Sequence, residues 1–199
     1  MKIEDLNNEE LNNYNPDIDP DIIPWKRERQ LKWEDFTGEP DVKNEAGALT
    51  KSIIYSKCDA KIVETTRGFK FQLVNISSVA LFQKSGSWVK PIVLRSNQHA
   101  IILKHEQGHF DIKEVYARKL QRKLYEMGKT NYPCKGETLA ERQKYADDEA
   151  EKVLNNLSKE MNREQRSLNE QYEDQTNHGI NLRNQGRWNL TIEKLLRES

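Results

Sequence analysis

The sequence has no long run of apolar residues. None of its apolar stretches approaches the roughly 20 residues that a membrane-spanning helix needs. The first ten residues, MKIEDLNNEE, also lack the basic start and the apolar stretch of a signal peptide. We therefore expect no integral membrane segment, and the chain shows no export signal of its own.

Neither sign of charge is in excess. The 32 Lys and Arg residues balance 32 Asp and Glu residues, so the formal net charge is zero. A nucleic-acid-binding domain normally shows a basic excess or a basic stripe, and we therefore expect no nucleic-acid partner. Since 199 residues can bury one good core, we expect a single domain over residues 25–199. Residues 1–24, rich in Asn, Asp, Glu and Pro, are expected to be extended or poorly ordered.

Cysteine is scarce. Cys58 and Cys134 show none of the spacings that mark a metal site or a disulfide framework. They could pair in an oxidising compartment, or remain buried free thiols. The cysteines therefore leave the compartment open.

The two halves of the chain differ in periodicity. From Leu31 to about Lys90 the pattern is β-like, with alternating apolar residues at Phe69, Phe71 and Leu73 and a turn at Arg67-Gly68. Three helical stretches follow: one from about 98 to 127, a long one through Tyr172, and a final one beyond residue 178. Strands followed by helices predict an α+β domain, of a compact zincin-like kind.

Histidine is scarce as well, and two of the four histidines fall in one pentapeptide. Residues 105–109 read His-Glu-Gln-Gly-His, which is the HExxH pattern. Histidines four residues apart lie one turn apart on the same helix face, and the adjacent glutamate can reach a water on the metal. His105 and His109 are therefore predicted ligands of one Zn²⁺ ion, and Glu106 the predicted general base. As core residues instead, both histidines would need polar partners inside an apolar stripe.

A catalytic zinc site normally has a third protein ligand and one open position. The metzincin pattern would place glycine and histidine three and six residues after His109, but Ile112 and Val115 stand there. The favoured third ligand is His178, in the turn-like segment Thr176-Asn177-His178-Gly179, from which a side chain can point back at an earlier helix.

Carboxylates are the alternatives for the third ligand, because Asp and Glu also complete zinc sites. The candidates are Asp148, Glu149 and Asp174. Tyr172 is a candidate donor to the oxyanion of the transition state, although a tyrosine on the last turn of a packed helix is more often a core residue.

Several segments of the chain resemble a bacterial family, long catalogued as a domain of unknown function, whose members are described as secreted zinc-dependent proteases. The resemblance covers roughly residues 31–190 and is most specific in HEQGHF joined to a later Tyr-x-x-x-Thr-x-His-Gly. The matching segments are Trp33 to Gly38, Ala48 to Thr50, Ser87 to Val89, Leu103 to Ile112 with Ala117-Arg118, and Tyr172 to Gly179 with Gln185 and Trp188.

This resemblance implies a zincin-like metallopeptidase that is periplasmic or secreted, and it includes His178 in the family pattern. The chain departs from the pattern at two positions. The family has Asp directly after the tyrosine and Glu one residue before the threonine, where this chain has Glu173 and Gln175. If those acids orient the third ligand, the site of this chain is tuned differently.

The sequence therefore predicts a zinc-dependent peptidase that acts on a peptide or protein substrate. The alternative is a non-catalytic module that keeps the zincin fold and binds a peptide or an envelope protein. Nothing in the sequence indicates an oligomeric state or a cleavage preference.

Overall fold

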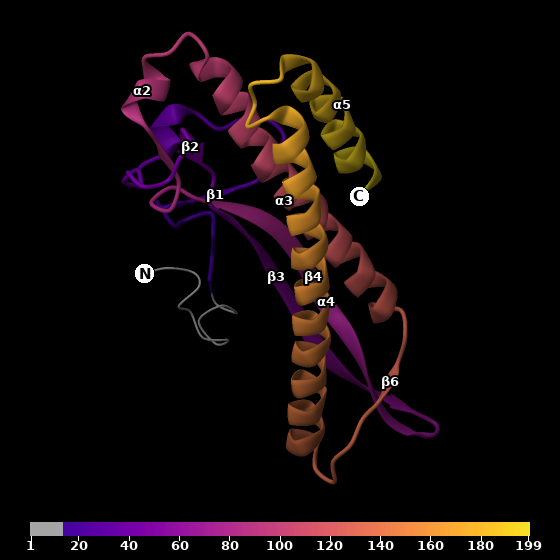
Figure 1. Ribbon diagram of the computed structural model, residues 1–199. Helices are drawn as coiled ribbons and strands as arrows, with labels where there is room; N and C mark the ends of the chain where they lie inside the picture. The colour runs from indigo at the N-terminus through magenta and orange to yellow at the C-terminus, as the bar shows by residue number, and fades with distance from the viewer. Residues whose placement is uncertain (1–13) are drawn as a thin grey trace.

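In the computed structural model, which describes residues 14–199, the strands come first and the long helices follow (Figure 1). The α+β order expected from the sequence is confirmed. The strands are β1 (Ile22–Pro24), β2 (Ala48–Leu49), β3 (Ser52–Thr65), β4 (Gly68–Gln83), β5 (Trp88–Val89) and β6 (Tyr132–Pro133). The helices are the 3-10 turn η2 (Trp33–Asp35), α2 (Pro91–Leu94), α3 (His99–Gly128), α4 (Leu139–Thr176) and α5 (Leu182–Glu198).

A long antiparallel hairpin of β3 and β4 forms the body of the main sheet. The strands pair from Ser52↔Phe82 to Thr65↔Gly68, and Gly68 supplies the positive φ of 105° that this tight turn requires. The turn expected at Arg67-Gly68 is thereby confirmed. The sheet order is β1-β4-β3, with β6 paired to the start of β4. A separate ribbon of β2 and β5 lies outside this sheet.

The N-terminal segment belongs to the sheet in part. Residues 1–13 of the expected lead-in lie outside the described residues. Farther on, β1 pairs with β4, and Ile22 packs in a buried cluster with Tyr55 and Leu81. The last residues of the expected lead-in are thus extended, and they contribute a strand to the sheet of the domain.

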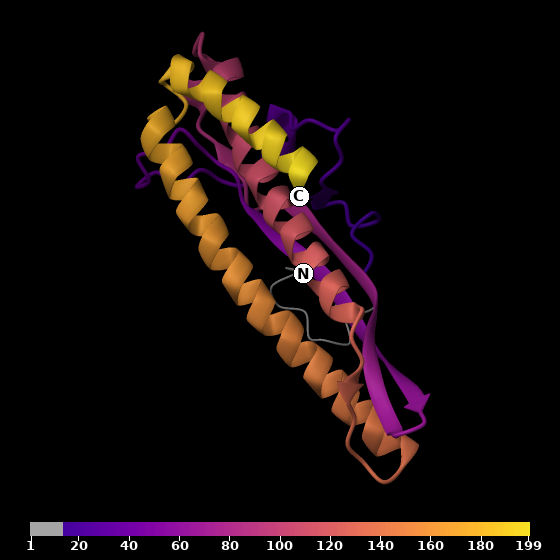
Figure 2. The same cartoon turned by 90° about the vertical axis from the view of Figure 1, so that its right-hand side faces the viewer.

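Helix α3 is the central element of the fold. It packs against β4 and β3 on one side and against α4 and α5 on the other (Figure 2). The interior of this packing is a large apolar cluster in which α3 residues such as Ile112, Val115, Leu120 and Leu124 are fully buried. The helix begins and ends close to the range expected from the sequence. Because α3 is held on several sides, side chains on it are rigidly placed.

Helix α4 runs beside α3 in the opposite direction (Figures 1 and 2). Its start is fixed by a capping box, in which the hydroxyl of Thr138 accepts from the backbone of Glu141. It ends where Asn177 adopts a left-handed conformation, with φ of 48°. The chain then turns into α5, so the end of α4 and the start of α5 lie over the first half of α3.

The molecule is elongated along α4 and the β3–β4 hairpin, rather than compact as expected (Figures 1 and 2). None of its helices within residues 14–199 combines the length and the apolar character that crossing a bilayer requires.

Replacing Leu120 by Ala should lower the free energy of unfolding by about 2–5 kcal/mol, because this fully buried side chain would leave a cavity in the core around α3. The measurement is urea unfolding followed by circular dichroism. Leu190→Ala is the matched control, since Leu190 is 72% exposed and should change stability by less than about 0.5 kcal/mol. Equal losses for the two variants would contradict the assigned core.

Candidate metal centre

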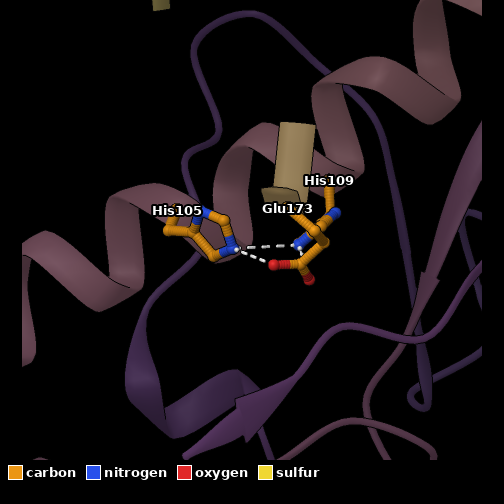
Figure 3. A group of neighbouring side chains, drawn as sticks. All are labelled: His105, His109 and Glu173. Atoms are coloured by element: carbon orange, nitrogen blue, oxygen red, sulfur yellow. Dashed lines mark hydrogen bonds and ion pairs between the residues drawn. The ribbon is translucent and has the colours of Figure 1, made fainter. Parts of the chain in front are cut away.

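Three potential metal ligands meet where the end of α4 crosses α3 (Figure 3). His105 and His109 come from α3 and Glu173 from the last turn of α4, and one ligand atom from each lies within 4.8 Å of the others. The two Nε2 atoms are 3.2 Å apart, and the carboxylate oxygens of Glu173 lie 3.2 Å from Nε2 of His105 and 3.0 Å from Nε2 of His109. Ligands about 2.0–2.2 Å from a tetrahedral zinc are separated by roughly 3.4 Å, so these spacings fit one small cation.

The third member of this group is Glu173, and not His178 as expected. His178 lies in the turn after α4, and its side chain is 72% exposed. Its Nδ1 is 2.8 Å from Oε2 of Glu173, so it contacts the group through the carboxylate. The cause is backbone geometry: α4 carries Glu173 directly over the two histidines, whereas the left-handed turn at Asn177 and His178 directs the next side chains outward.

The three carboxylates considered as alternatives also lie outside the group. Asp148 and Glu149 are paired with Lys144 and Lys152 in the first half of α4. Glu149 is 24 residues before Glu173, which is roughly 36 Å along a helix. Asp174 is the neighbour of Glu173 and lines the adjacent groove, but it contributes no atom to the group of three.

The histidine rings are oriented by amide side chains behind them. Nδ1 of His105 lies 3.0 Å from Oε1 of Gln185 on α5, and Nδ1 of His109 lies 3.2 Å from Oδ1 of Asn169 on α4. An amide oxygen can only accept, so each Nδ1 donates to its amide, and Nε2 is the ring nitrogen that points at Glu173 and at the place where a metal would bind. Such outer hydrogen bonds fix the tautomer and the direction of metal-ligating histidines.

Tyr172 forms the floor beneath the histidines. It is fully buried, and its ring stacks on His105 with centroids 4.6 Å apart. Its hydroxyl donates to the backbone carbonyl of His105 at 3.1 Å and accepts from Gln185 at 2.8 Å. The oxyanion role considered for Tyr172 does not fit this placement, because its donor is already used inside the core.

Two glycines allow this close packing. A Cβ on Gly108 would lie 2.2 Å from the Tyr172 hydroxyl, and a Cβ on Gly179 would lie 2.9 Å from Cβ of His105. Gly179 also has a positive φ of 82°, which disfavours other residues. The glycine inside the HEQGH helix is therefore explained by the approach of α4.

The charges around the group favour a cation. Burial by itself lowers the pKa of His109, but the hydrogen bond to Glu173 and the charge of Glu106 raise it above its ordinary value. Burial likewise raises the pKa of Glu173, but hydrogen bonds from His105 and His109 hold it well below its usual range. A bound divalent cation would satisfy the same surplus of negative charge.

Glu106 faces a groove beside the group and is not part of the group itself. Its carboxylate accepts a hydrogen bond from Oγ1 of Thr50 at 2.7 Å. The groove has a volume of about 920 Å³ and also contacts His109 and Glu173. Its walls are α3, α4 and residues 46–52, which include β2. The HExxH glutamate therefore lies where a molecule in the groove could meet it.

A scan against protein-family models, a search of curated proteins and a search of solved structures each found no match to the chain. The family resemblance of the sequence thus stays an expectation. Function must be inferred from the site itself.

Glu173→Ala should lower zinc affinity at least tenfold, because it removes one of three converging ligand atoms. His178→Ala should leave the zinc stoichiometry unchanged, since His178 contacts only the carboxylate. Titration of the purified proteins against a competing chelator measures both. Loss of zinc from the His178 variant with zinc retained by the Glu173 variant would reverse the assignment.

Gln185→Leu should weaken zinc binding about 10–100-fold, because His105 loses the acceptor that fixes its Nδ1 proton. Gln185→Glu keeps an acceptor at this place and should bind zinc more tightly than Gln185→Leu. Gln171→Leu, on the exposed side of α4, is the control. Melting temperatures report whether each variant folds. If Gln185→Leu folds and binds zinc as tightly as the wild-type protein, the orienting role is refuted.

Proposed function

We propose that the protein is a zinc-dependent peptidase whose metal is held by His105, His109 and Glu173. The observation that carries the proposal is the convergence of these three ligand atoms beside an open groove that Glu106 also lines. Two histidines with one glutamate are a ligand set of catalytic zinc sites, which keep a position open. A structural zinc site would instead close the coordination with a fourth protein ligand.

Zinc is favoured over calcium and magnesium by the chemistry of the donors. Two imidazole nitrogens and one carboxylate suit zinc, whereas calcium and magnesium prefer oxygen ligands alone. In such a site zinc supplies Lewis acidity, which lowers the pKa of a water toward 7 and polarises a carbonyl group. Because each Nδ1 donates to an amide oxygen, Nε2 is the nitrogen left for the metal, which binds it in its deprotonated form.

Glu106 is the proposed general base. It follows His105 on α3 and lines the same groove as His109 and Glu173, while it remains outside the group of potential ligands. The hydroxyl of Thr50 donates to Oε2 and thereby holds the carboxylate on the side of the groove. Glu106 would accept a proton from the attacking water and pass it to the leaving amine.

The groove supports a peptide as the substrate class. It is open to solvent, and it is lined by residues of both signs and by polar amides. Peptide chains in such grooves are held by many backbone contacts, since each residue offers a donor and an acceptor. The resemblance to secreted zinc-dependent proteases points to the same reaction class.

Glu106→Gln should reduce hydrolysis of an unfolded protein such as fluorescently labelled casein by about 10²–10⁴-fold, because the amide cannot accept the proton. Its zinc content should stay at the wild-type level, since Glu106 is not in the ligand group. Glu170→Gln is the control, another groove carboxylate outside that group. If zinc-loaded wild-type protein hydrolyses no peptide bond, the alternative of a non-catalytic binding module gains support.

A further inference from the structure

The groove continues past the metal centre to a second group of polar residues. Lys113 lies one turn after His109 on α3, about 6 Å farther along the helix. Because α4 runs antiparallel, the residues that face it there are Gln165 and Arg166, one turn before Asn169. Lys113, Gln165 and Arg166 all line the same groove as Glu106 and His109.

Two cations, Lys113 and Arg166, line this level of the groove without an ion-pair partner among residues 14–199. Nζ of Lys113 donates to Oε1 of Gln165 at 2.8 Å. Neither Lys113 nor Arg166 forms an ion pair with any carboxylate of residues 14–199. This includes the carboxylate of Glu170, which lies one turn from Arg166 on α4. Burial and the charge of Arg166 lower the pKa of Lys113 to about 8.

The same two helices are joined differently outside the groove. Farther along the interface, Lys123 on α3 pairs with Glu160 on α4 at 2.7 Å. Lys123 thus has a carboxylate partner across the α3–α4 interface, whereas Lys113 has the amide of Gln165. Lys113 is partly buried, whereas Arg166 is exposed at the edge of the groove. Partial removal of the Lys113 ammonium from water is unfavourable unless it is compensated, and a bound anion would compensate it while Arg166 adds a second donor group.

We propose that Lys113 and Arg166 form a subsite for a carboxylate of the peptide substrate, close to the bond that is cut. This inference rests on the proposed peptidase function and adds a preference to it. An extended chain advances about 3.3–3.6 Å per residue, so the carboxylate belongs to a residue within about two positions of the scissile bond. It can be an Asp or Glu side chain, or the α-carboxylate of the last residue.

The chemistry of the two side chains suits this ligand. Arginine binds carboxylates through paired N–H donors, and lysine adds a point charge with donors free to rotate. Gln165 directs the ammonium by accepting one of its three hydrogens, which leaves two for a ligand.

Binding is tested first, independently of turnover. The probes are four short peptide hydroxamates, whose hydroxamate binds zinc: each carries Glu or Gln beside the hydroxamate, and ends in a free carboxylate or an amide. Calorimetry with zinc-loaded wild-type protein should show about tenfold tighter binding of an acidic probe than of its neutral counterpart. Preference for Glu over Gln assigns the side chain, and preference for the free acid over the amide assigns the chain terminus.

The variants localise the preference. Lys113→Met and Arg166→Gln should each reduce the ratio of affinities for the acidic and the neutral probe at least threefold, and should leave binding of the neutral probe unchanged. Arg163→Gln should not alter it, because Arg163 is an exposed arginine of α4 that does not line the groove. Equal affinity of wild-type protein for all four probes, or an undiminished preference in both variants, overturns the subsite.

Hydrolysis by the same proteins separates the two proposals. If peptides are cut with no preference for acidic residues and the hydroxamates show none, the subsite is wrong and the peptidase stands. If the acidic probe is preferred but no peptide is cut, the subsite stands and the peptidase fails. If zinc does not bind and no probe is retained, both are wrong.

Discussion

The structure depends on the contact between the last turn of α4 and the first half of α3. Tyr172 is fully buried beneath His105, and Glu173, the next residue, reaches both histidines of the group from above. One helix turn thus supplies both the apolar support and the charged side chain. The carboxylate of Glu173 is held against two imidazoles, and removing these polar groups from water is costly. Burial of Tyr172 stabilises the helix contact and offsets this cost.

The hydrogen-bonded residues behind the site connect it to the C-terminal helix. Gln185 on α5 joins His105 to the Tyr172 hydroxyl, so α3, α4 and α5 meet in one network. A network of this kind is effective only when all its members are satisfied. Of these helices, α3 and α4 continue as walls of the groove, which Lys113 and Arg166 both line. The candidate metal centre and the proposed anion subsite therefore lie one helix turn apart between the same two helices, α3 and α4.

Much of the fold could be predicted from periodicity. The α3 helix, the α+β order and the hairpin turn follow from local patterns, which short-range physics controls. The missed strand β1 depends on pairing with β4, which no local pattern of three residues shows. Glu173 was missed as the third member of the group for a related reason. The resemblance marked Glu173 only as an acid that could orient the third ligand, and its place in the group depends on where a 38-residue helix ends in space.

The sequence by itself determined the identity and spacing of His105, Glu106 and His109, because a helix places residues four apart on one face whatever surrounds it. Only the tertiary structure decided the third partner. The choice between Glu173 and His178 turns on the left-handed residues that end α4, and on the approach permitted by Gly108. A local motif fixes the positions of two potential ligands, whereas the third is set by the packing of helices far apart in the chain.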